Sequence, residues 1–171
     1  FESWLRRLEA AELISFDTET TSLDYMRAEI VGVSFCVEAG SAAYVPLAHT
    51  YPGAPDQLDR TMVLDALRPL LEDPARAKLG HHLKYDAHVL RNHGIELRGM
   101  RYDSMLESYV LNSTATRHDL DSTAKLYLGV DTIHYEDVAG KGAKQLPFNE
   151  VPVERAAEYS AEDSDVSLQL H

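Results

Sequence analysis

Residues 13–20 have the sequence Leu-Ile-Ser-Phe-Asp-Thr-Glu-Thr, in which a β-prone run leads into acidic residues. Leu13–Phe16 predicts a short buried strand that ends at Asp17. Asp17 and Glu19 are two residues apart, so in extended backbone both side chains leave the same face. Two carboxylates at the end of a buried strand repel each other unless a cation lies between them. Oxygen ligands of this type suit Mg²⁺ or Mn²⁺, and the alternative is a solvated strand end.

The residues that follow predict a β-meander. Ile30–Val37 is a long apolar run, and Ala43–Pro46 is another β-prone segment after a break at Gly40. Three strands in quick succession indicate antiparallel pairing. Residues 51–59, with two prolines and a glycine, predict a loop.

The remainder of the chain alternates between helical patterns and one short strand. Apolar residues three and four apart predict helices at 1–8, 62–71, around 89–90 with an end at Gly94, 105–111, 120–128 and 153–170. Asp103 is expected to cap the helix that follows it. Ala77–Gly80 predicts a short buried strand, and residues 140–152 predict a flexible loop. With the meander, this order indicates an α/β domain with a mixed sheet.

Composition limits the possible functions. The chain has 171 residues and a formal charge of −12, from 16 Lys+Arg and 28 Asp+Glu. This charge argues against a protein that coats nucleic acid by bulk electrostatics, but it permits a nuclease whose carboxylates hold metal ions. The single cysteine cannot form an internal disulfide, and no apolar run is long enough for a membrane span. Both ends fall abruptly in helical patterns, so we interpret residues 1–171 as a single domain excised from a longer polypeptide.

Two further segments place carboxylates beside helices. Residues 81–86 (His-His-Leu-Lys-Tyr-Asp) lie where a strand passes into a helix, and Asp86 could equally be a first-turn residue stabilised by the helix dipole. Tyr159 and Asp163 are one turn apart on the last predicted helix and share a face. A buried Tyr and Asp require partners, such as a metal or a water network. Glu162 is expected to be solvated.

Together these residues resemble a known family. The set Asp17/Glu19, Asp86 and Tyr159/Asp163 resembles the three motifs of the DEDD proofreading exonucleases of the tyrosine subclass. Five segments are similar to the 3′→5′ exonuclease domain of bacterial polymerase I type (family A) DNA polymerases: Leu-Lys-Tyr-Asp at 83–86, Gly-Ile-Glu-Leu-Arg-Gly at 94–99, Asp-Ser-Met-Leu-Glu-Ser-Tyr at 103–109, Arg-His-Asp at 117–119 and Ala-Glu-Asp-Ser-Asp-Val at 161–166. The similarity covers essentially the whole chain. It implies an α/β, RNase H-like (DnaQ-like exonuclease) fold, with a mixed central sheet of about five strands and helices on both faces.

The resemblance also implies a metal-dependent 3′→5′ exodeoxyribonuclease that uses two divalent cations, Mg²⁺ or Mn²⁺. Asp17 would bridge both ions, and Glu19 and Asp163 would complete the more tightly held one. Asp86 would anchor the second ion, largely through water. Tyr159 would orient the attacking water together with Glu19, because a phenol with an ordinary pKa near 10 is a poor general base.

The substrate contacts follow from the same resemblance. Leu23 would wedge against the terminal base, and Phe148 would stack on a neighbouring base. For Phe148 the alternative is that the ring anchors its own loop. Tyr85 and Arg117 match groups near the phosphates and the metal site. His82 takes the place of a substrate-contacting Asn.

This last position is part of a departure from the family pattern. The family usually has Gln-Asn where this chain has His81-His82, which changes the detail of the sugar or base contact. Histidine can still donate a hydrogen bond. Zinc is not expected, because no cysteine lies nearby and no second ligand pair completes a zinc site.

The expected partners are the 3′ end of single-stranded or frayed DNA and the polymerase domain of the same parent chain. The domain is expected to be a monomer that contacts no membrane and acts in the bacterial cytoplasm, associated with the nucleoid. Two alternatives stay open: a catalytically silent domain that only braces a polymerase, and an exoribonuclease of the RNase D type. The complete carboxylate set favours activity, and the matches outside the motifs favour DNA. Comparing turnover on single-stranded DNA and RNA would separate the two nucleases.

Overall fold

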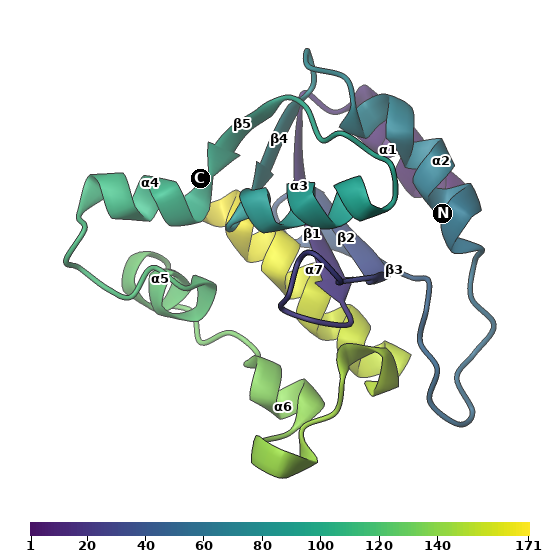
Figure 1. The fold of residues 1–171 in the computed structure, drawn as a ribbon. Coiled ribbons are helices and arrows are strands. Elements are labelled where there is room, and N and C mark those ends of the chain that lie inside the picture. Colours follow the sequence, from purple (N-terminus) through teal and green to yellow (C-terminus); the bar gives the residue numbers. More distant parts are fainter.

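Five strands form one mixed sheet in the computed structural model, which describes residues 1–171 (Figure 1). The strands are β1 (Leu13–Thr20), β2 (Ile30–Glu38), β3 (Ser41–Pro46), β4 (Ala77–Gly80) and β5 (Met100–Asp103). Their spatial order is β3-β2-β1-β4-β5. The pairs β1–β2 and β2–β3 are antiparallel, whereas β1–β4 and β4–β5 are parallel. The predicted meander and the mixed sheet are therefore confirmed.

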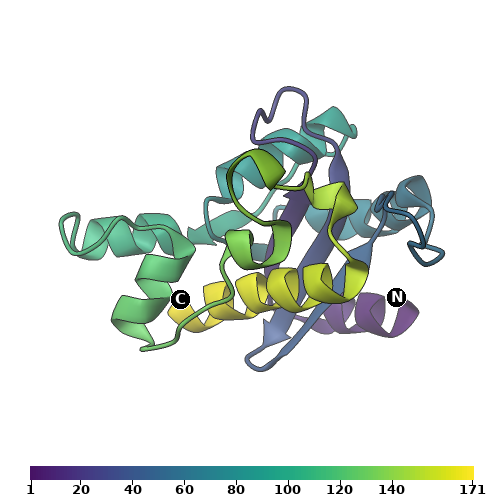
Figure 2. The same ribbon diagram turned by 90° about the horizontal axis from the view of Figure 1, so that it is seen from below.

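Helices cover both faces of the sheet, as expected. They are α1 (Glu2–Ala10), α2 (Arg60–Leu71), α3 (Leu83–Asn92), α4 (Ser104–Leu111), α5 (Leu120–Tyr127), α6 (Tyr135–Ala139) and α7 (Val153–Leu170). Helices α1, α2 and α3 share one hydrophobic core with the sheet. Helix α7 crosses the other face and packs on β1, β2, β3 and β4 (Figure 2). Helices α5 and α6 pack against α7.

Alternation along β1 assigns its side chains to these two faces. Ile14 and Phe16 enter the larger core with α1, α2 and α3. Ser15 points the other way, and its hydroxyl donates to the carbonyl oxygen of Ser164 in α7 at 2.7 Å. Because side chains alternate with a period of two, Asp17 and Glu19 share the α7 face with Ser15. The strand thus directs both carboxylates toward α7.

Strand β1 is longer than the sequence predicts. It continues past Asp17 to Thr20, because these residues keep pairing with β2, with Asp17 opposite Ser34 and Glu19 opposite Gly32. The two carboxylates therefore lie within the strand and not at its end. A Cβ atom at position 32 would overlap the ring of Tyr44. Because Gly32 has none, this ring packs directly over the strand beside Glu19.

Three further elements differ from the predictions. Strand β5 and helix α6 have only four and five residues, too few to produce a clear periodic pattern. Residues 140–152, predicted to be a flexible loop, contain two short 3₁₀ turns at Gly142–Lys144 and Phe148–Glu150. The second turn is held by a small hydrophobic core that includes Phe148 and Val151. No helix has the length and apolar character that crossing a membrane requires.

Candidate active site

Three carboxylates from two elements converge on the face of the sheet that α7 covers. Asp17 and Glu19 come from β1, and Asp163 comes from the middle of α7. One oxygen of each carboxylate lies within 4.8 Å of the others, so the three side chains form a group that could hold a metal ion. The alternation of β1 and the path of α7 produce this convergence.

Burial makes the negative charge of this group unfavourable. Burial raises the pKa of Asp17 from 3.8 to about 6. The pKa of Glu19 lies well above its usual value, because the side chain is buried and the charges of Asp17 and Asp163 are close. Burial, followed by the charge of Asp17, likewise raises the pKa of Asp163. Oε1 of Glu19 is buried without a hydrogen-bond partner. A divalent cation would offset the repulsion and give this oxygen a partner, so the group fits one.

Asp86 reaches the same region from the first turn of α3. Its side chain is 3% exposed, and Oδ1 accepts hydrogen bonds from the Thr18 amide at 3.0 Å and the Thr18 hydroxyl at 2.6 Å. Burial, with the charge of Asp17 as the next cause, raises its pKa well above the usual value. Asp86 is not one of the three converging carboxylates, but it lines the same cleft. It therefore occupies a separate position beside Asp17.

Tyr159 lies one turn before Asp163 on α7 and also lines the cleft. Its ring packs against the rings of Phe148 and Tyr135, with centroids 6.1 and 6.2 Å away. Burial, and then the charges of Asp163 and Glu19, raise the pKa of the phenol. At neutral pH the phenol keeps its proton, so it can donate a hydrogen bond but cannot act as a base.

The cleft has a volume of about 1010 Å³. Leu23 lies at its rim with its side chain 93% exposed. Tyr85 shapes the same rim, because its hydroxyl donates to the carbonyl oxygen of Ser22 at 2.6 Å and lies 2.5 Å from the Thr20 hydroxyl. His82 is exposed and has left-handed backbone, with φ of 67°. The structure thus brings Leu23, His82 and Tyr85 to the cleft that holds the carboxylates.

Phe148, expected to stack on a base, lies elsewhere. Its side chain is 1% exposed and packs in a core cluster with Val31, Val151 and Ala156. The buried ring presents almost no surface to a base in this structure, which favours the alternative in which Phe148 anchors its own loop. Stacking of Phe148 on a base stays a prediction. A sequence pattern shows that an aromatic residue is present but not whether other side chains cover it.

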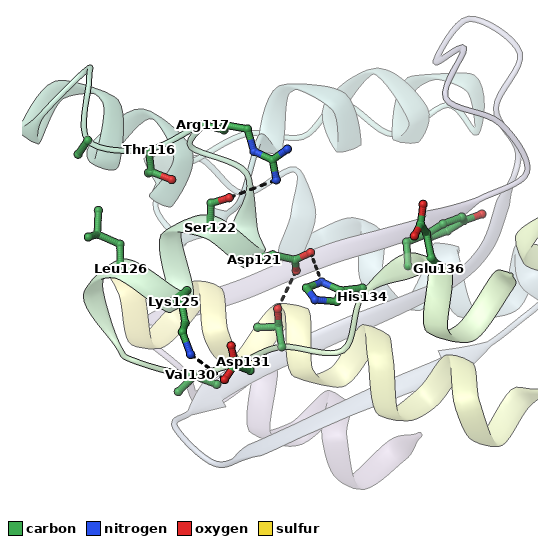
Figure 3. A pocket seen from close by; sticks show the side chains of 13 residues that line it. Thr116, Arg117, Asp121, Ser122, Lys125, Leu126, Val130, Asp131, His134 and Glu136 are labelled. Atoms are coloured by element: carbon green, nitrogen blue, oxygen red, sulfur yellow. Dashed lines mark hydrogen bonds and ion pairs between the residues drawn. The ribbon is translucent and has the colours of Figure 1, made fainter. Parts of the chain in front are cut away.

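Arg117 lines a second cleft, of about 900 Å³, and not the first (Figure 3). The side chain is exposed, with Nε 3.1 Å from Asp119 and a hydrogen bond to the Ser122 hydroxyl at 3.4 Å. Tyr135 and Glu136 of α6 line both clefts, so this short helix divides them.

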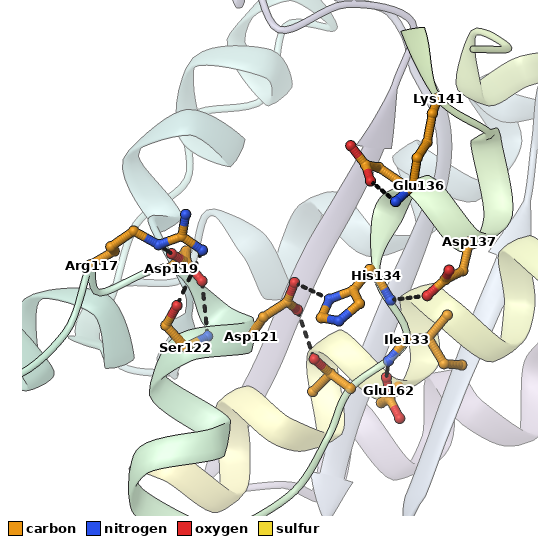
Figure 4. A network of polar contacts seen from close by, with 11 residues as sticks. Arg117, Asp119, Asp121, Ser122, Ile133, His134, Glu136, Asp137, Lys141 and Glu162 are labelled. Carbon is orange, nitrogen blue, oxygen red and sulfur yellow. Dashed lines mark hydrogen bonds and ion pairs between the residues drawn. The ribbon is translucent and has the colours of Figure 1, made fainter. Parts of the chain in front are cut away.

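A polar network holds the segment that leads into α6 (Figure 4). Asp121 accepts a hydrogen bond from the Thr132 hydroxyl at 2.7 Å and lies 2.6 Å from Nδ1 of His134. The hydrogen bond and charge of Asp121 raise the pKa of His134. Glu162, expected to be solvated, instead accepts a hydrogen bond from the Ile133 amide at 2.6 Å.

Sequence reasoning singled out His81 only as part of the His81-His82 pair, and it missed several other residues of the first cleft, namely Tyr135, Glu136, Gln145, Leu146 and Pro147. Most of them lie in or just after the short helix α6, which gave no periodic signal. Tyr135 is an exposed aromatic residue beside the cleft and could have been considered on that ground. His81 is held in place, because Nδ1 lies 2.8 Å from the Ser104 hydroxyl and Nε2 lies 2.9 Å from the carbonyl oxygen of His118. Burial lowers the pKa of His81.

Comparison with known proteins adds independent information. A family model described as 3′-5′ exonuclease matches residues 1–171. The chain is 63% identical to DNA polymerase I of Pseudomonas aeruginosa over 173 residues, covering 100% of this chain and 19% of that protein. It is 39% identical to DNA polymerase I of Rhizobium leguminosarum over 186 residues, covering 99% and 18%. The chain therefore spans about a fifth of the length of these relatives.

The fold has relatives among solved structures. The structure of Trypanosoma brucei RNase D matches with a TM-score of 0.73 and 18% identity, covering 99% of this chain and 59% of that chain. At this identity the likeness concerns the fold alone, which is the RNase H-like fold of 3′-5′ exonucleases. The fold class expected from the sequence is confirmed.

Proposed function

Because this chain belongs to the family of 3′-5′ exonuclease domains of bacterial DNA polymerase I, we propose that it removes nucleotides from the 3′ end of single-stranded or frayed DNA. Its role would be to proofread for the polymerase portion of a longer polypeptide, in which residues 1–171 form the nuclease domain. The observation that carries this proposal is the convergence of Asp17, Glu19 and Asp163, with one buried oxygen lacking a partner. The protein would act as a monomer on DNA in the bacterial cytoplasm, associated with the nucleoid.

The carboxylates divide into two positions that would hold divalent cations, Mg²⁺ or Mn²⁺. Asp17, Glu19 and Asp163 would hold one cation, and Asp86 would contribute to a second beside Asp17. When bound, the cations would stabilise the charge on the phosphate that is cleaved and lower the pKa of the attacking water. That the site holds two cations is inferred from the family resemblance, and the separate position of Asp86 supports it.

Around this centre, the chain's own residues would orient water and DNA. Tyr159 keeps its proton and would donate a hydrogen bond that holds the attacking water, with Glu19 as the second contact. Leu23 would wedge against the terminal base and His82 would contact the sugar or base, since both are exposed at the cleft. Tyr85 would act near the phosphates and holds the rim in shape.

For two substrate contacts the structure favours a different placement. Tyr135 would take the stacking role that was expected of Phe148, because Tyr135 lines the cleft while Phe148 is buried. Arg117, exposed on the neighbouring cleft, would contact backbone phosphates there.

The test is the release of labelled 5′-mononucleotide from a 3′-labelled single DNA strand in the presence of Mn²⁺. We expect Asp163→Asn to reduce the rate at least about 100-fold, because electrostatic stabilisation at the reacting phosphate is commonly the largest catalytic contribution. Glu158→Gln is the matched control, since Glu158 is an exposed carboxylate on the same helix. No release by the wild-type chain would support the silent bracing role. Faster release from RNA than from DNA of the same sequence would support the RNase D alternative.

A further inference from the structure

Tyr135 follows a segment that forms no helix or strand, residues 128–134 between α5 and α6. Helix α6, which begins at Tyr135, has five residues, too few to be stable without tertiary contacts. Its second half is anchored, because Val138 and Ala139 are buried in the small core that contains Phe148. Tyr135 itself is less enclosed, since it is 38% exposed and lines the cleft. Its position therefore depends strongly on the residues that precede it.

Two carboxylates from different helices hold the last part of this segment (Figure 4). Asp121 of α5 accepts a hydrogen bond from the Thr132 hydroxyl at 2.7 Å and lies 2.6 Å from Nδ1 of His134. Glu162 of α7 accepts a hydrogen bond from the Ile133 amide at 2.6 Å. Hydrogen bonds to a carboxylate are stronger than those between neutral groups. Three consecutive residues immediately before α6 are thus held from two sides.

The Glu162 contact also connects this segment to the helix that carries Asp163. Glu162 directly precedes Asp163 on α7, and Tyr159 lies one turn before Asp163. The ring of Tyr135 lies against that of Tyr159, with centroids 6.2 Å apart. The same turn of α7 therefore carries one of the converging carboxylates and fixes the segment that leads to Tyr135. A shift of this segment would move Tyr135 relative to Asp163.

We propose that Glu162 and Asp121 are positioning residues that hold Tyr135 against a nucleotide of the bound strand. This inference rests on the proposed function, in which Tyr135 stacks on a base beside the converging carboxylates. Neither Glu162 nor Asp121 touches DNA or metal in this role. Each acts through the hydrogen bonds that it accepts, so its loss should mainly weaken strand binding and leave the metal centre intact.

The charges of these two side chains also reach the converging carboxylates. Burial and the charge of Asp17 are the main causes of the raised pKa of Asp163, and the charges of Asp121 and Glu162 add to it. A test must therefore separate the loss of a hydrogen bond from the loss of a charge. Glu162→Gln and Glu162→Ala remove the same charge, but only glutamine keeps an oxygen that can accept a hydrogen bond from the Ile133 amide.

The test compares the affinity of these two variants for a labelled oligothymidine, measured by fluorescence anisotropy in EDTA. Glu162→Ala should weaken binding about fivefold or more, because a misplaced Tyr135 loses part of the contribution of a stacked base. Glu162→Gln should keep most of the affinity. Asp121→Ala should resemble Glu162→Ala, and Glu158→Ala, at an exposed position on α7, is the control. Added to Tyr135→Ala, Glu162→Ala should have little further effect, because both act at one contact.

Two further measurements show how the effect arises. The Ile133 amide should exchange its hydrogen at least about tenfold faster in Glu162→Ala than in Glu162→Gln, because it loses its acceptor. In mononucleotide release with Mn²⁺, Glu162→Ala should raise KM and change kcat little. Calorimetry should give the same heat of Mn²⁺ binding for both variants, and urea unfolding of each confirms that the domain stays folded.

Equal strand affinity in Glu162→Ala and Glu162→Gln would overturn the inference, because the effect of Glu162 would then come from its charge or be absent. Faster exchange of the Ile133 amide without weaker binding would overturn it as well. Failure of the proposed function gives a different result. A wild-type chain that releases no mononucleotide but binds the strand more tightly than Glu162→Ala refutes only the nuclease function, whereas normal release with equal affinities refutes only the positioning role.

Discussion

Oδ1 of Asp86 accepts two hydrogen bonds from Thr18, one from the amide at 3.0 Å and one from the hydroxyl at 2.6 Å. Thr18 lies between Asp17 and Glu19 on β1 and points to the opposite face of the sheet. The strand therefore presents two carboxylates on one face and secures a third, from α3, with the residue between them. This contact couples the position of Asp86 directly to that of Asp17.

Thr18→Val tests this coupling, because valine keeps the shape of threonine and removes only the hydroxyl bond. We expect a loss of about 1–2 kcal/mol in the free energy of unfolding, since the acceptor is a carboxyl group. The hydrolysis rate should fall as well, because Asp86 is less firmly held. Urea unfolding and mononucleotide release measure the two effects. Thr61→Val, at an exposed position on α2, is the control and should change neither. Equal stability of the two variants would contradict a structural role for the hydroxyl.

The pH dependence of stability follows from the raised pKa of Asp17, about 6 when folded against an ordinary 3.8. Between these values the folded chain holds a proton that the unfolded chain has released. In the absence of divalent ions, stability should therefore fall as the pH rises from about 4 to about 6. The raised pKa values of Glu19, Asp86 and Asp163 contribute in the same direction.

Asp17→Asn isolates the contribution of Asp17 to this pH dependence of stability, since asparagine cannot ionise. Wild type and variant should be similar in stability near pH 4, and the variant should be the more stable near pH 7. Urea unfolding in EDTA across this range gives the difference, with exposed Asp56→Asn as the control. A difference between wild type and Asp17→Asn that does not change with pH would contradict the prediction.

Divalent cations should reverse the destabilisation that the ionised carboxylates cause at neutral pH. A cation that binds only the folded chain raises stability by mass action, about 2.7 kcal/mol at a concentration one hundred times its dissociation constant. The melting temperature should thus increase with the Mn²⁺ concentration. Asp17→Ala should lose most of the increase and most of the heat of Mn²⁺ binding in calorimetry. The same increase in wild type and Asp17→Ala would show that the ions bind elsewhere.

Tyr159→Phe separates the orientation of water from proton transfer. The ring of phenylalanine keeps its contacts with Phe148 and Tyr135, so fold and metal binding should survive. Loss of one positioning hydrogen bond should reduce the rate about 10- to 100-fold. The shape of the pH profile should not change, because the phenol keeps its proton and the ionisation belongs to the attacking water. Single-turnover rates at several pH values provide the measurement. Loss of the alkaline rise in the variant would instead identify Tyr159 as the base.

Substitution of Phe148 should mainly affect stability, whereas substitution of Tyr135 should mainly affect DNA binding. Phe148→Ala removes a buried ring and should destabilise the chain by about 3–5 kcal/mol. Tyr135→Ala should change stability less but weaken binding of a single strand, because a stacked base contributes about 1–3 kcal/mol. Urea unfolding and fluorescence anisotropy with a labelled oligothymidine distinguish the two. Tight DNA binding by Tyr135→Ala would remove Tyr135 from the proposed contacts.

Much of the fold could be predicted because its signals are local. The apolar spacing of 153–170 predicted α7 with its correct bounds, and the order of strands and helices predicted a mixed sheet. The cap at Asp103 was also correct, since its side chain accepts hydrogen bonds from the amides of Met105 and Leu106. Strand β5 and helix α6 were not predicted, because elements this short are stabilised by their neighbours and not by their own pattern.

The sequence by itself determined which carboxylates are available and, through the two-residue spacing of Asp17 and Glu19, that both leave one face of a strand. Only the tertiary structure decided that Asp163 meets them, because its position depends on how α7 crosses the sheet 146 residues after Asp17. The tertiary structure likewise decided that Phe148 is buried and Tyr135 lines the cleft. Burial is a property of all the elements that surround a side chain, so neither residue's own segment contains that information.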